Sequence, residues 1–129
     1  MEARKPMPGS IRVLIADDHR LFSDALEAIL TAEPEMEVVG RARNGEEAIE
    51  QALALDPDVI LMDIEMPVVD GVEATKRIRE LRQSACVLML TGSNSRTDVA
   101  RAREAGAAAY VTKDRIAAQL IDAIRELAA

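Results

Sequence analysis

The sequence predicts a doubly wound α/β fold, in which an open, five-stranded parallel sheet carries helices on both faces. Short apolar runs alternate with amphipathic segments, giving five successive strand–helix units. The runs lack the polar alternation of half-exposed strands, and five units are too few for a closed eight-stranded barrel. A length of 129 residues is ordinary for a single domain of this kind.

The predicted strands differ in how polar they are. Residues 13–16, 59–62 and 87–90 are almost uninterrupted apolar runs, typical of parallel strands covered on both faces. Residues 36–42 are more polar and suit an edge strand, and residues 108–111 are a short fifth candidate.

The segments between the strands have helical periodicity. Asn44 and Asp70 each precede a glutamate by three residues, as N-cap pairs do, and Pro57 is expected to end the second helix. Apolar residues recur on one face of the first and last helices, namely Leu21, Phe22, Ala25, Leu26, Ile29 and Leu30, then Ile116, Leu120, Ile124 and Leu127.

The predicted fourth helix, residues 97–105, is unlike the others. Val99 is its only large apolar residue, and Gly106 is expected to end it. Because its helix propensity is high but its apolar anchoring area is small, we expect this helix to be the least firmly docked.

Composition excludes several classes of protein. With 16 basic and 23 acidic residues the net charge is −7, which argues against nucleic acid or anionic lipid as a direct partner. A single cysteine, Cys86, excludes an intrachain disulfide and a multi-cysteine zinc site. There is no apolar run of membrane-spanning length, and residues 1–10 are predicted to be a flexible leader outside the fold. We therefore expect a cytoplasmic protein.

Polar residues follow four of the five predicted strands. The first strand is followed by Asp17 and Asp18, the third by Asp63, the fourth by Thr91 and the fifth by Lys113. Open parallel sheets bind their ligands beyond the carboxyl ends of the strands. The sequence therefore predicts that these five side chains converge at one edge.

Three carboxylates at one edge have a specific physical consequence. They repel one another by about 4 kcal/mol per pair at about 4 Å and an effective dielectric constant of about 20. Either their pKa values rise or a cation neutralises them, and hard oxygen ligands suit Mg²⁺. A carboxylate nucleophile, a divalent cation, a lysine and a hydroxyl are the groups that phosphoryl transfer requires.

At these residues the sequence resembles the receiver domain of two-component response regulators, of the CheY-like fold and the NarL/FixJ (LuxR-type) branch. The resemblance covers residues 11–127 and implies a flavodoxin-like three-layer sandwich with strand order 2-1-3-4-5. The matching pieces are Asp17-Asp18-His19-Arg20-Leu21-Phe22, Asp63-Ile64-Glu65-Met66-Pro67-Val68-Val69-Asp70-Gly71, Thr91-Gly92 and Lys113-Asp114.

The resemblance implies a role for each acidic residue. Asp63 would accept a phosphoryl group from a phosphohistidine of a sensor histidine kinase. Asp18 and Asp63 would bind Mg²⁺ together with the backbone carbonyl of Glu65, and Asp17 would help through a water molecule. Such a domain catalyses only its own phosphorylation and dephosphorylation, so we do not expect an enzyme in the usual sense.

The resemblance also implies how the signal leaves the site. Lys113 would pair with the phosphoryl group, the Thr91 hydroxyl would bond one of its oxygens, and Tyr110 would swing inward as Thr91 moves. Gly92 would leave room for the phosphoryl group. Two further positions, Glu65 and Ser93, would tune the lifetime of the phosphate.

We expect the added charge to shift the weakly docked fourth helix, so that this helix, the fifth strand and the fifth helix form the output surface. That surface would control homodimerisation and a C-terminal helix-turn-helix DNA-binding domain that residues 1–129 do not include. The alternative is a stand-alone receiver that acts through protein contacts.

Two other functions fit the predicted architecture. A flavodoxin-like cofactor binder would need a Gly-, Ser- and Thr-rich loop where Asp17 and Asp18 stand. An aspartyl-phosphate phosphatase would resemble D-x-D-x-[TV] at its nucleophile, whereas Glu65 and Pro67 follow Asp63 here.

Three residues also have simple structural interpretations. His19 is expected at the surface or at a helix start, Cys86 in the core, and Tyr110 half-buried at an edge.

Overall fold

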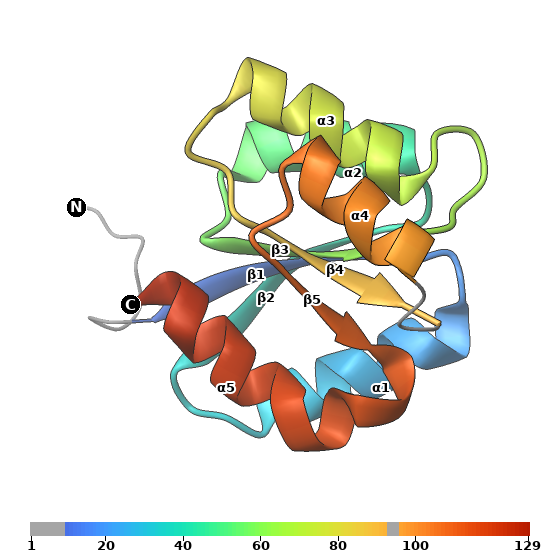
Figure 1. Cartoon of the computed structure of the whole chain (residues 1–129). Helices are drawn as coiled ribbons and strands as arrows, with labels where there is room; N and C mark the ends of the chain where they lie inside the picture. The colour runs from blue at the N-terminus through green and yellow to red at the C-terminus, as the bar shows by residue number, and fades with distance from the viewer. Residues whose placement is uncertain (1–9, 93–95) are drawn as a thin grey trace.

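The structure is a computed structural model that describes residues 10–92 and 96–129. The predicted leader, apart from Ser10, and the predicted tuning position Ser93 therefore lie outside the described residues. The elements follow in strict alternation (Figure 1): β1 (Ile11–Ala16), α1 (Arg20–Thr31), β2 (Met36–Ala42), α2 (Gly45–Leu55), β3 (Val59–Asp63), α3 (Gly71–Leu81), β4 (Val87–Thr91), α4 (Arg96–Ala105), β5 (Ala109–Thr112), a short 3₁₀ turn (Lys113–Arg115) and α5 (Ile116–Ala128).

The five strands form one parallel sheet in the order β2-β1-β3-β4-β5, as predicted. The three apolar strands are central, and the more polar β2 and the short β5 are the edges. In β3 and β4 every residue is buried, which explains why their sequences lack polar alternation.

Helices cover both faces of the sheet (Figure 1). One face packs against α1 and α5 through residues such as Leu26, Leu30 and Leu120. The other face packs against α2, α3 and α4 through Ala48 and Ile78, among others. Among the described residues, none of the helices is both long and apolar enough to cross a membrane.

The helix ends agree with the sequence signals. Asn44 and Asp70 are N-caps, and their side chains accept hydrogen bonds of 2.8 Å from the backbone N–H groups of Glu47 and Glu73. At Gly106 the φ angle is +102°, which suits glycine and ends α4.

The strand boundaries differ slightly from prediction. β1 begins two residues earlier than predicted, and β5 lies one residue later, at Ala109–Thr112. The polar Arg12 interrupts the apolar run of β1, and the small or polar residues at the ends of β5 carry little apolar signal, so the backbone pairing sets these limits. The shift makes Thr112 the partner of Thr91 across the two strands and places Lys113 directly after β5.

α4 has little apolar anchoring, as its composition predicted. Its buried residues are two alanines, Ala102 and Ala105, and Val99 is only partly buried. Burying two methyl groups contributes far less than the Leu and Ile side chains that hold α1 and α5.

Candidate functional site

The carboxyl ends of four strands bring the predicted residues to one edge of the sheet. Asp17 and Asp18 follow β1, and Lys113 follows β5. Asp63 and Thr91 are the last residues of β3 and β4, one position further inside the strands than predicted. Because they end buried strands, both side chains lie in the protein interior.

The acidic residues form a compact cluster. One ligand atom each of Asp17, Asp18, His19 and Asp63 lies within 4.8 Å of the others. The Nδ1 atom of His19 is 3.1 Å from Oδ1 of Asp17, 3.2 Å from Oδ1 of Asp18 and 3.8 Å from Oδ2 of Asp63. His19 stands at the N-cap position of α1, as the sequence suggested, but its ring also contacts the carboxylates, which the sequence analysis missed.

Lys113 bridges two of the carboxylates. Its Nζ atom lies 3.4 Å from Oδ2 of both Asp17 and Asp63. These two oxygens are buried and have no hydrogen-bond partner among the described residues. Ion pairs at this distance are longer than strong charge-assisted hydrogen bonds, so both oxygens remain able to bind a cation.

Burial and repulsion act together on Asp63. Burial of the carboxylate, followed by the nearby charge of Asp17, raises the pKa of Asp63 to about 6. Lys113 and a backbone N–H from Glu65, 3.4 Å from Oδ1, partly offset this rise. At neutral pH the charged carboxylate is therefore only mildly favoured over the neutral acid, and any added positive charge stabilises it.

The donor set fits a magnesium ion. Carboxylate oxygens at the edge of a cavity are hard ligands of the kind Mg²⁺ takes, and two of them lack a hydrogen bond in the described structure. Asp18 and Asp63 would hold the ion. Glu65 lines the adjacent cavity. Binding of the ion by the backbone carbonyl of Glu65 stays a prediction.

A cavity of about 200 Å³ lies beside the cluster. Its lining combines residues of the acidic cluster with residues of the loops after β3, β4 and β5 and of α4, namely His19, Asp63, Ile64, Glu65, Gly92, Asp98 and Lys113. No atom of residues 10–92 or 96–129 lies within 4 Å of where a Cβ at Gly92 would be, so the described part of this edge is open. The sequence analysis did not single out Asp98. Its position in the first turn of the helix that follows the fourth strand was the signal that could have identified it.

The loop after β3 holds Asp63 in place. Gly71 donates a 3.0 Å hydrogen bond to the carbonyl of Ile64, and a Cβ at Gly71 would overlap the carbonyl oxygen of Asp63. Gly71 therefore does more than form a turn, because the absence of a side chain allows α3 to begin in contact with the end of β3. In the same loop Val68 has a φ angle of 70°, an unfavourable conformation for a β-branched residue.

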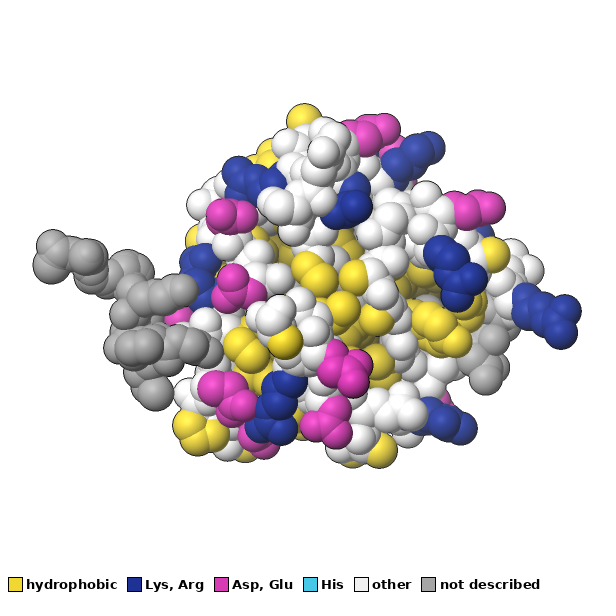
Figure 2. Space-filling model, turned by 60° about the vertical axis from the view of Figure 1, so that its left-hand side comes forward, with side chains coloured by type: hydrophobic (Ala, Val, Ile, Leu, Met, Phe, Trp, Pro, Cys, Tyr) yellow, Lys and Arg dark blue, Asp and Glu magenta, His cyan; other side chains and the backbone are white. Residues whose placement is uncertain are grey.

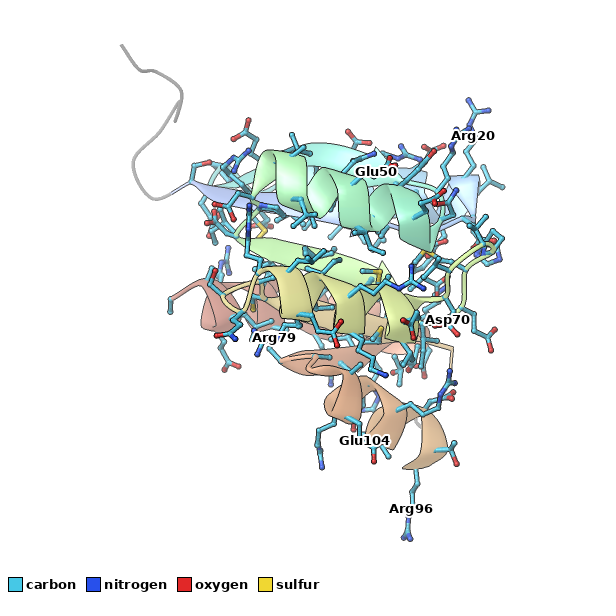
Figure 3. All side chains as sticks on the ribbon, turned by 90° about the horizontal axis from the view of Figure 1, so that it is seen from above. Arg20, Glu50, Asp70, Arg79, Arg96 and Glu104 are labelled. Atoms are coloured by element: carbon cyan, nitrogen blue, oxygen red, sulfur yellow. The ribbon has the colours of Figure 1, made fainter. Side chains whose placement is uncertain are left out.

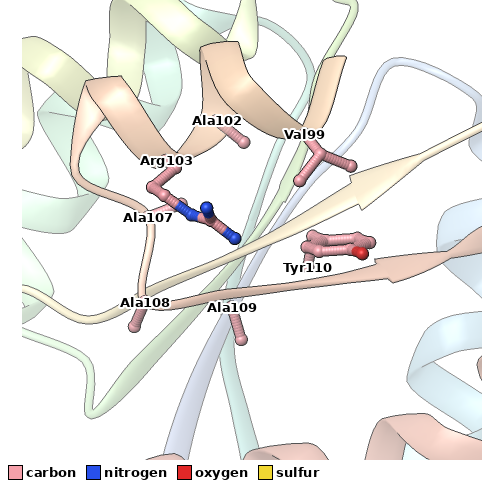
Figure 4. A pocket seen from close by; sticks show the side chains of 7 residues that line it. All are labelled: Val99, Ala102, Arg103, Ala107, Ala108, Ala109 and Tyr110. Atoms are coloured by element: carbon pink, nitrogen blue, oxygen red, sulfur yellow. The ribbon is translucent and has the colours of Figure 1, made fainter. Parts of the chain in front are cut away.

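The predicted switch residues lie at different depths. Thr91 is fully buried, whereas Tyr110 is 42% exposed and points toward a pocket between α4 and β5 that Val99 and Arg103 also line (Figure 4). The inward movement of Tyr110 stays a prediction.

Figure 2 shows a face on which apolar side chains are exposed among interspersed basic and acidic ones.

Cys86 lies just before β4 and is partly buried. Its expected place in the core is therefore wrong, because Cys86 precedes the buried strand and belongs to neither core cluster. Partial burial raises the pKa of its thiol, which favours the neutral, unreactive form.

The fold and the site together define a doubly wound α/β protein with a buried carboxylate cluster at the carboxyl ends of its strands. A family model described as the response regulator receiver domain matches residues 13–125. The chain belongs to this family, the receiver domains of two-component response regulators, and its relatives are regulators of the NarL and LuxR type.

Three known proteins illustrate the relationship. The chain is 42% identical over 114 residues to the transcriptional regulatory protein LnrK of Bacillus subtilis, covering 88% of this chain and 52% of that protein. The receiver domain of the putative response regulator NarL from Mycobacterium tuberculosis has a TM-score of 0.89 at 31% identity, covering 94% of this chain and 98% of that one. A CheX–CheY complex with BeF₃ and Mg²⁺ from Borrelia burgdorferi has a TM-score of 0.84 at 26% identity, covering 91% and 88%.

Proposed function

We propose that Asp63 accepts a phosphoryl group from a phosphohistidine of a sensor histidine kinase in a reaction that depends on Mg²⁺. The observation that carries this proposal is the buried Asp63 carboxylate, which faces a cavity of about 200 Å³ beside Lys113 and the acidic cluster. A bound Mg²⁺ would supply positive charge to the phosphoryl oxygens.

The chemistry is a transfer between two nucleophiles. A carboxylate oxygen of Asp63 attacks phosphorus, and the phosphorus–nitrogen bond breaks with its electron pair passing to the imidazole nitrogen. The product is a carboxylic–phosphoric anhydride, which water later hydrolyses to inorganic phosphate. Lys113 would hold a phosphoryl oxygen, and the Thr91 hydroxyl would bond another. The domain would thus catalyse only its own phosphorylation and dephosphorylation.

The output concerns a longer protein. The chain spans about half the length of the curated relatives it matches, and several of these are named transcriptional regulatory proteins. The names of these relatives support a cytoplasmic regulator of transcription over a stand-alone receiver. In such a regulator α4, β5 and α5 would control homodimerisation and a C-terminal helix-turn-helix domain.

Intact mass after incubation with Mg²⁺ and acetyl phosphate tests the acceptor. We expect the gain of one phosphoryl group, which disappears in Asp63→Asn and when Mg²⁺ is chelated. Labelling that persists in Asp63→Asn would overturn the assignment. Thr91→Ala should still be phosphorylated, but the change in amide exchange over α4 and β5 should become smaller.

A further inference from the structure

Asp98 places a negative charge on the wall of the cavity that faces Asp63. It lies in the first turn of α4, its side chain is 28% exposed, and it lines the cavity together with Asp63 and Lys113. The acidic cluster of β1 and β3 can share a bound cation, but Asp98 lies on a different element and is not part of that cluster.

Arg101, one turn further along α4, balances this charge. Its Nη1 atom is 3.6 Å from Oδ1 of Asp98, and its Nη2 atom is 3.7 Å from Oδ2 of Asp70. The other oxygen of Asp70 caps α3 through Glu73. Arg101 therefore connects the cavity wall on α4 to the beginning of α3, which Figure 3 marks with Asp70.

We propose that Asp98 is the residue through which α4 responds to charge on Asp63, and that Arg101 sets the strength of this response. The proposal rests on the proposed phosphorylation of Asp63. A phosphorylated aspartate carries up to two negative charges where the carboxylate carried one, so repulsion across the cavity increases.

The consequence follows from the weak docking of α4. The buried residues of this helix are two alanines, so a modest repulsion at its first turn changes the balance between docked and displaced arrangements. Asp98 opposes the arrival of an anion at Asp63, and the same repulsion loosens the start of α4 once the anion is bound. The side chain of Asp98 thereby couples the phosphorylation of Asp63 to the docking of α4.

The first test is the rate of phosphorylation by acetyl phosphate, followed by intact mass at saturating Mg²⁺. Asp98→Asn should increase the rate of Asp63 phosphorylation by about three- to tenfold. This increase should shrink in high salt because the interaction is electrostatic. Asp98→Glu should restore the rate toward that of the wild type. Glu104→Gln is the matched control, because it removes the same charge from an exposed position of α4 outside the cavity lining and should leave the rate unchanged (Figure 3).

The second test is a double-mutant cycle with Arg101. Arg101→Gln should slow the phosphorylation of Asp63 because the positive charge beside Asp98 is removed, and the effect should be much smaller in the Asp98→Asn background. Amide exchange with the phosphoryl mimic BeF₃⁻ reports the output. Exchange in α4 should increase on binding in the wild type and change less in Asp98→Asn.

The outcomes separate this proposal from the one on which it rests. Phosphorylation that fails in the wild type would overturn both. A wild type that is phosphorylated on Asp63, with equal loading in Asp98→Asn and Glu104→Gln at low salt, would overturn the role of Asp98 alone.

Discussion

The Nζ atom of Lys113 lies over the ring of Phe22, 4.4 Å from its centroid. The ammonium group thus has carboxylates on one side, at 3.4 Å, and an aromatic face on another. A cation–π contact of this kind contributes about 0.5–2 kcal/mol and limits the positions open to a flexible side chain. Phe22, which the sequence predicted only as an apolar residue of the first helix, therefore helps to position Lys113.

Phe22→Leu should slow phosphorylation by acetyl phosphate about two- to fivefold, because the apolar contact remains while the cation–π contact is lost. Intact mass against time measures the rate. The same substitution made in a Lys113→Gln background should have little further effect. Equal additional slowing in both backgrounds would show that Phe22 acts through packing instead.

Asp63→Asn should change how stability depends on pH. The pKa of Asp63 is raised from 3.8 to about 6 in the folded state, so the folded state binds the proton more tightly than the unfolded state. The wild type therefore loses stability as pH rises from about 4 to about 6, by up to about 3 kcal/mol.

Chemical denaturation from pH about 4 to about 7.5 without Mg²⁺ measures this effect. Asp63→Asn should be more stable than the wild type at neutral pH, and the difference should shrink toward pH 4, where both side chains are neutral. A constant difference across the range would contradict the raised pKa. Adding Mg²⁺ should stabilise the wild type more than the variant.

Gly71→Ala should destabilise the domain by about 2 kcal/mol or more, because a Cβ there overlaps the carbonyl oxygen of Asp63. Gly92→Ala is the matched substitution at an open position and should change the free energy of unfolding by less than about 0.5 kcal/mol. Urea denaturation compares the two. Equal losses would show that the close approach of Gly71 to β3 is unimportant.

Val68→Asn should stabilise the domain by about 1 kcal/mol. Val68 is 75% exposed and has a φ angle of 70°, so little burial is lost while asparagine tolerates the left-handed conformation better. Thermal unfolding measures the gain. The neighbouring Val69 packs against the core, and Val69→Asn should destabilise instead.

The sequence by itself determined the alternation of strands and helices, the helix caps and the strands whose ends carry Asp17, Asp63, Thr91 and Lys113. These features depend on local periodicity and on neighbours three or four residues apart, which a single sequence displays. The limits of β5 were one residue off because small and polar residues at a strand end carry little apolar signal.

Only the tertiary structure decided which side chains meet across elements. The ring of His19 lies among the carboxylates, Phe22 lies under Lys113, and Asp98 lines the cavity that faces Asp63. Apart from the contacts of His19 with the neighbouring Asp17 and Asp18, these contacts join residues far apart in the chain, and their distances depend on how helices pack on the sheet. Sequence periodicity assigns a residue to a face of its own helix, but the packing of that helix sets what the residue touches.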